Sequence, residues 1–163
     1  MADPVWVVDT SSIIEIRRSV PNAERRQLFS RLSALVGEGR LKFPRQVLEE
    51  LRRAAIPDAP DALLEWAEQV ASGASTEPEY AKVKALLTEV PDILDPDKDS
   101  GVDEADPYVL ALAGGLREQG FDARIVTQET KDSPSKMSLN TAAGVIGIPS
   151  TPLRGLLLAE DIS

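Results

Sequence analysis

The sequence predicts an α/β sandwich with a mostly parallel sheet, because two buried-strand patterns are separated by helical ones. Residues 5–8 (VWVV) are an unbroken apolar run, and residues 124–127 (RIVT) are a second buried-strand candidate; both are rich in β-branched side chains. Such runs are typical of strands that are buried on both faces, as in a parallel sheet. Amphipathic helical patterns lie between the two runs. Helices that alternate with short apolar strands indicate this fold class.

The first third of the chain is predicted to contain three helices and a second strand. SSIIEIRR, which follows the first strand, indicates a helix start with Ser12 and Glu15 spaced as a capping box. Residues 24–36 place their apolar side chains on one helical face. Residues 41–43 are a short strand candidate, and Pro44 stands at a favourable first-turn position for a helix in PRQVLEELRR.

The middle segment, about residues 57–100, is helical and acidic, and we interpret it as a cover on a single domain of residues 1–163. Helices are predicted at residues 62–71 and 80–90. Pro107 then opens a helix with Asp106 at its N-cap. The strand at 124–127 is followed by a small-residue helix (SLNTAAGVIG), and then by a short strand and a C-terminal helix.

The composition restricts the chemistry that this chain can perform. It contains no Cys and no His, which excludes thiol nucleophiles, zinc thiolates and the usual general base. Catalysis would therefore depend on carboxylates, hydroxyls, Lys or Arg. No apolar run approaches the roughly 20 residues that span a membrane. MADPVW carries an acid where a signal peptide would carry positive charge, so we expect a cytoplasmic protein.

Four carboxylates occupy comparable places in the predicted fold. Asp9 and Glu129 follow strands, Glu50 borders the apolar face of a helix, and Asp106 precedes a helix. Each also has an ordinary structural explanation: Asp9 and Asp106 as helix caps, Glu50 as a solvated side chain, Glu129 as a turn residue. Four converging acids without matching basic residues would repel one another, and a hard cation, Mg²⁺ or Mn²⁺, relieves this repulsion.

The same four acids carry a resemblance to the PIN-domain nucleases, including VapC-like toxins. VWVVDTSS resembles the opening motif of that family, and VLEEL, ADPYVLALA and IVTQE resemble the three later ones, in order. The resemblance extends from about residue 5 to residue 148. It maps the family's acids to Asp9, Glu50, Asp106 and Glu129.

This resemblance implies a three-layer α/β/α fold, an endoribonuclease that depends on Mg²⁺ or Mn²⁺, and frequent homodimers. It also implies the toxin of a type II toxin–antitoxin system, with an antitoxin protein as partner. The four acids would be the catalytic metal ligands. Supporting roles are predicted for Thr10, Ser11, Asp103 and Thr127. Capping at a helix start explains Thr10 and Ser11 equally well, and for Asp103 we favour a place in the solvated acidic loop.

The charge distribution leaves an RNA partner open. The net charge is −9, but residues 1–56 contain ten Lys/Arg against seven Asp/Glu, whereas residues 57–106 contain three against fourteen. An evenly acidic surface would repel phosphates. We predict phosphate contacts from the Arg-rich first third and from one later loop. The predicted residues are Arg17, Arg25, Arg26, Arg45, Arg52 and Lys136.

Three other functions compete with this hypothesis. Asp95, Asp97, Asp99 and Asp103 partly match a calcium loop, but the Gly is displaced and position 12 is Asp. A dehalogenase-type phosphatase would need a second Asp where the chain has Ser11. The remaining alternative is a PIN-like protein-binding module with a weak or lost site, whose acidic middle segment would dock a basic protein.

Overall fold

The centre of the molecule is a short, all-parallel sheet. The computed structural model describes residues 3–55, 61–94 and 104–162. Within these ranges the strands are β1 (Val5–Val8), β2 (Leu41–Lys42), β3 (Ala123–Val126) and β4 (Ser150–Thr151), in the order β2-β1-β3-β4. Trp6 pairs with Leu41, and Val126 pairs with Thr151. The predicted α/β class with a mostly parallel sheet is confirmed.

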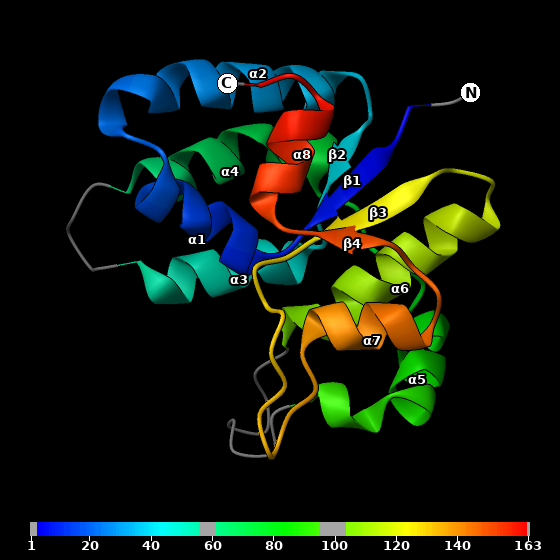
Figure 1. Ribbon diagram of the computed structural model, residues 1–163. Helices are drawn as coiled ribbons and strands as arrows, with labels where there is room; N and C mark the ends of the chain where they lie inside the picture. Colours follow the sequence, from blue (N-terminus) through cyan, green and yellow to red (C-terminus); the bar gives the residue numbers. More distant parts are fainter. Residues whose placement is uncertain (1–2, 56–60, 95–103, 163) are drawn as a thin grey trace.

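Helices cover both faces of this sheet, which makes a three-layer α/β/α sandwich. Figure 1 shows α2 and α4 above the sheet, with α8 in front, and α5, α6 and α7 below it. The helices are α1 (Thr10–Ser19), α2 (Asn22–Gly37), α3 (Arg45–Ala54), α4 (Ala62–Ala74), α5 (Tyr80–Glu89), α6 (Ala105–Glu118), α7 (Leu139–Val145) and α8 (Leu153–Ala159). A 3₁₀ turn, η1, spans Pro91–Ile93.

The apolar runs form strands because both of their faces are covered. All four residues of β1 are buried, and Val7 and Ile125 have no exposed surface. Trp6 is also buried, and its indole N–H donates a 2.8 Å hydrogen bond to Glu160 near the end of the chain. Burying an indole leaves its N–H in need of a partner. This hydrogen bond therefore links the C-terminal segment to the central strand.

The two described helices of the middle segment pack on the rest of the molecule. Helix α4 contacts α2, α3 and β2, and α5 packs along α6. Phe29 of α2 stacks on Trp66 of α4, with ring centroids 5.3 Å apart and ring planes 19° apart. These contacts bury the apolar faces of both helices. In the described ranges no helix is long and apolar enough to cross a membrane.

The predicted capping box is wrong. Helix α1 begins at Thr10, directly after β1, and Asp9 is its N-cap: its carboxylate accepts a 2.9 Å hydrogen bond from the backbone N–H of Ser12. Ser12 therefore lies inside the first turn, where it is buried. Glu15 instead accepts from Ser19 one turn later. The strand passes into the helix through a single residue, which sets the direction of the Asp9 side chain.

A close approach between β4 and α8 predicts a strong effect of Gly155→Ala. A Cβ at this position would lie 1.7 Å from Oγ1 and 3.0 Å from Cβ of Thr151. We expect a loss of about 1–3 kcal/mol in the free energy of unfolding, because packed interiors resist an added methyl group. Urea denaturation measures this. The control is Gly144→Ala in α7, whose Cβ would meet nothing within 4 Å. Equal stability of the two variants would contradict the predicted clash.

Candidate metal centre

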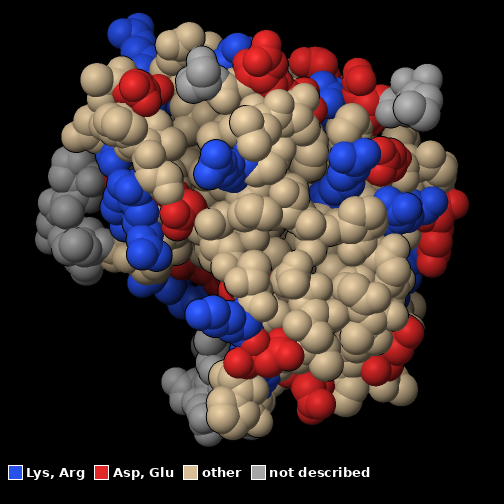
Figure 2. All heavy atoms as spheres, in the orientation of Figure 1, with Lys and Arg blue, Asp and Glu red and all other residues tan. Residues whose placement is uncertain are grey.

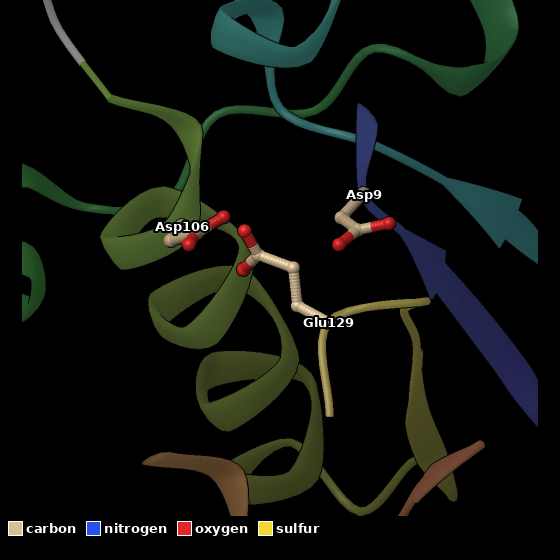
Figure 3. Close-up of side chains that lie close together, drawn as sticks. All are labelled: Asp9, Asp106 and Glu129. Carbon is tan, nitrogen blue, oxygen red and sulfur yellow. The ribbon is translucent and has the colours of Figure 1, made fainter. Parts of the chain in front are cut away.

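Three of the four predicted acids meet at the carboxyl ends of β1 and β3. Asp9 follows β1, Glu129 follows β3, and Asp106 lies in the first turn of α6. One carboxylate oxygen from each of them lies within 4.8 Å of the others. In Figure 3 the Glu129 side chain extends toward Asp106, with Asp9 on the other side. We call these three residues the acidic triad.

Asp9 is the most buried member of the triad and the most firmly held. Its side chain accepts hydrogen bonds from the Ser11 hydroxyl at 2.9 Å and the Thr127 hydroxyl at 2.5 Å, besides the helix-capping bond. It is only 2% exposed. Burial raises the pKa of Asp9 to about 6, assisted by the nearby charge of Asp106 and opposed by these hydrogen bonds. Asp9 therefore both caps α1 and belongs to the triad.

Glu129 carries an oxygen whose hydrogen-bonding capacity is unused. Its backbone N–H donates to the Thr127 hydroxyl at 3.0 Å, and its carbonyl accepts from the backbone of Asn140 at 3.2 Å. These bonds fix the backbone of Glu129 where its side chain extends toward Asp106. Its Oε2 is buried and has no hydrogen-bond partner. Burial raises the pKa of Glu129 to about 7, and the Asp106 carboxylate adds to the shift.

Asp106 is not the N-cap of its helix, contrary to the prediction. Helix α6 begins at Ala105 with Glu104 as its N-cap, so Asp106 is the second helical residue and Pro107 the third. Proline is tolerated here because the first backbone N–H groups of a helix lack intrahelical partners anyway. The carboxylate of Asp106 is therefore not used as a cap. It accepts a 2.8 Å hydrogen bond from the Lys136 ammonium instead.

Glu50 lies at the same cleft but outside the triad. The cleft has a volume of about 460 Å³, and Glu50 lines it together with the three triad residues. Its carboxylate accepts from the Thr10 hydroxyl at 2.5 Å and from the backbone N–H of Ala105 at 3.2 Å. Glu50 thus connects the starts of α1 and α6. Its predicted role as a direct ligand stays a prediction.

The hydroxyl residues predicted to support the site contact its acids directly. Thr10 holds Glu50, and Thr127 bridges Asp9 and the backbone of Glu129. Ser11 donates to Asp9 and accepts from the backbone N–H of Gln128 at 3.0 Å. Asp103 lies outside the described residues. The same holds for the other acids of the calcium-loop alternative.

The predicted phosphate-binding residues are mostly outside the cleft. Among the described basic residues, Lys136 and Arg53 line it. Arg17, Arg45 and Arg52 pair with Asp61, Glu49 and Glu68, and Arg25 bonds to Asn22 and to the backbone of Val20 and Arg17. Arg26 is exposed on α2 and does not line the cleft. Figure 2 shows basic side chains gathered over the α1 and α3 side of the molecule.

Arg53 and Glu104 line the cleft and were missed in the sequence. A signal for Arg53 was present, because it follows Glu50 by three residues on α3, and residues three apart share a helix face. Glu104 is 9% exposed and lies two residues before Asp106. No periodic pattern marks it. The structure places it as the N-cap residue of α6.

One comparison with known proteins yields a match. The sequence model of the family described as "Domain of unknown function (DUF4411)" matches residues 6–162, which is nearly the whole chain. A comparison with curated proteins yields no match.

Proposed function

This chain belongs to the DUF4411 family, and we propose that it is a metal-dependent endoribonuclease with a PIN-like active site. The observation that carries the proposal is the acidic triad, whose oxygens converge within 4.8 Å at the carboxyl ends of two parallel strands. Ligands of open α/β folds bind at this end of the sheet. The four acidic motifs resemble those of PIN nucleases and follow in the same order. This resemblance supports cleavage of RNA as the reaction.

The residues of the triad fit a hard divalent cation. The triad offers only carboxylate oxygens, which hard cations prefer as ligands. The chain has no His or Cys, the residues that favour zinc or copper. The partnerless Oε2 of Glu129 is a buried acceptor that a cation would satisfy. Burial, with a smaller contribution from the Asp106 carboxylate, raises the pKa of both Asp9 and Glu129, so a nearby cation would favour their ionised forms. Mg²⁺ or Mn²⁺ is the cofactor that suits this donor set.

The roles of the side chains follow from their contacts. Asp9, Asp106 and Glu129 would hold the cation, which supplies an activated water and stabilises charge on the phosphodiester. Thr127 and Ser11 orient Asp9, and Thr10 orients Glu50 at the rim of the cleft. Lys136 and Arg53 are the basic side chains on the wall where an RNA backbone would lie.

The test is cleavage of a labelled single-stranded RNA by the purified chain. We expect products with Mn²⁺ or Mg²⁺, none with excess EDTA, and recovery when Mn²⁺ is restored, because the reaction needs the cation. Asp106→Asn should lose at least about 10³-fold in rate. Glu118→Gln, at the other end of α6 and paired with Lys82, is the matched control. Cleavage that persists in EDTA or in Asp106→Asn would refute the proposal.

We also propose the biological setting that the resemblance implies, namely a cytoplasmic toxin restrained by an antitoxin protein. A short reading frame next to this one, whose product binds the chain and blocks RNA cleavage, would support it. Size-exclusion chromatography with light scattering tests the proposed homodimer. If the chain binds no metal and cleaves no RNA, the alternative of a PIN-like protein-binding module replaces this proposal.

A further inference from the structure

The Lys136 ammonium lies among the acids of the triad rather than in solvent. Its Nζ is 2.8 Å from Oδ2 of Asp106 and 3.5 Å from Oε1 of Glu129. Its side chain is 20% exposed, much less than is usual for a lysine. One ammonium therefore contacts two of the three carboxylates that would hold the cation.

Backbone hydrogen bonds fix the place of Lys136 in the loop between β3 and α7. Ser133 and Lys136 exchange two of them, at 2.9 and 3.3 Å. The two residues that follow Lys136 are also held. The N–H of Met137 donates to the carbonyl of Asp92 at 2.7 Å, and the N–H of Ser138 donates to the Asp132 carboxylate at 2.8 Å. The loop is thus anchored on both sides of the lysine. The fold thus holds the backbone of Lys136 next to the triad, and the contacts with Asp106 and Glu129 hold its ammonium there.

The charges of the triad and of Lys136 bear on how many cations the site takes. Three carboxylates and one ammonium sum to two negative charges, which a single divalent cation neutralises. Two-metal nuclease sites place their ions about 3.5–4 Å apart, with carboxylates shared between them. Here two carboxylates of the triad, those of Asp106 and Glu129, are already bridged by an ammonium. A second divalent cation at these two carboxylates would have to displace this ammonium.

We propose that Lys136 is a positioning residue that takes the place of a second metal ion, so that this site binds a single divalent cation. The inference rests on the proposed function, since it concerns the same triad. It assigns to Lys136 a role in the metal site itself, in addition to the predicted contact with RNA phosphate. It also separates this chain from nucleases that use two ions.

The number of bound Mn²⁺ ions tests this inference without any measurement of catalysis. Isothermal titration calorimetry, checked by electron paramagnetic resonance of free Mn²⁺, should give one ion for the unmodified chain. Lys136→Met should give two, because Asp106 and Glu129 lose their ammonium. Lys136→Arg should return to one, since the positive charge is restored. Lys131→Met, an exposed lysine in the same loop, should stay at one.

The outcomes separate this inference from the proposed function. Two Mn²⁺ ions in the unmodified chain, or one in Lys136→Met, would overturn the inference, and RNA cleavage by the same preparation would leave the nuclease standing. A chain that binds no Mn²⁺ overturns both. Thermal unfolding shows whether Lys136→Met is folded, and Lys136→Gln, which also removes the charge, replaces it if it is not.

Discussion

Asp9→Asn is expected to abolish metal-dependent RNA cleavage and, at the same time, to make the metal-free chain more stable above pH 6. Asp9 is 2% exposed and its pKa is raised to about 6, with burial as the largest cause. At pH 8 the folded chain therefore holds a buried charge that the unfolded chain solvates freely. Asparagine removes this charge but can still accept the capping bond from Ser12. The cleavage rate should fall at least about 10³-fold, because a cation ligand is lost.

The size of the gain in stability from Asp9→Asn depends on pH. Because the folded-state pKa is above the unfolded value of 3.8, protonation of Asp9 stabilises the fold below pH 4, and this contribution is lost as pH rises through about 6. The shift corresponds to at most about 3 kcal/mol. Asparagine also weakens the bonds from Ser11 and Thr127, so we expect a net gain of about 1–2 kcal/mol at pH 8 and none at pH 4.

Urea denaturation in EDTA at both pH values measures this gain. Added Mn²⁺ should then raise the unfolding midpoint of the parent but not that of Asp9→Asn, because ligand binding stabilises only a folded state that can bind. Glu118→Gln, an exposed acid, serves as the control and should behave as the parent does. The assignment of Asp9 fails if the variant keeps its response to Mn²⁺.

Mn²⁺ affinity is expected to fall steeply on acidification, in two steps. A cation binds ionised carboxylates, so it competes with protons wherever pH is below the pKa of a ligand. The pKa of Glu129 is raised to about 7 and that of Asp9 to about 6, burial being the largest cause for both. The dissociation constant should be nearly constant above pH 7.5. It should then rise about tenfold per pH unit between 7 and 6, and more steeply below 6.

Calorimetric titrations with Mn²⁺ at several pH values between 8 and 5 measure these steps. Glu129→Gln provides the internal control, because it removes the step near pH 7 and should leave the one near pH 6. An affinity that is constant between pH 8 and 5.5 would show that neither carboxylate is a ligand.

The strands and their order of appearance were predictable because burial on both faces leaves a direct mark on sequence. β1 is an unbroken apolar run and β3 is rich in β-branched side chains, and each was predicted within one residue of its observed bounds. Helix bounds were harder to predict. DP before an apolar run suits both a helix that starts at the Pro, with the Asp as its N-cap, and a helix that starts two residues earlier, as α6 does. The choice is made by the surroundings of Asp106, whose carboxylate meets Lys136.

For this protein, the sequence by itself determined the α/β class, the parallel sheet and the placing of Asp9 and Glu129 directly after buried strands. These are local consequences of apolar periodicity and of where each run stops. Only the tertiary structure decided which acids meet. It brings Asp106 to the triad, leaves Glu50 bonded to Thr10 and Ala105, and inserts Lys136 from a loop. Contacts between residues 30 to 118 positions apart depend on how the layers pack, and no local pattern records that packing.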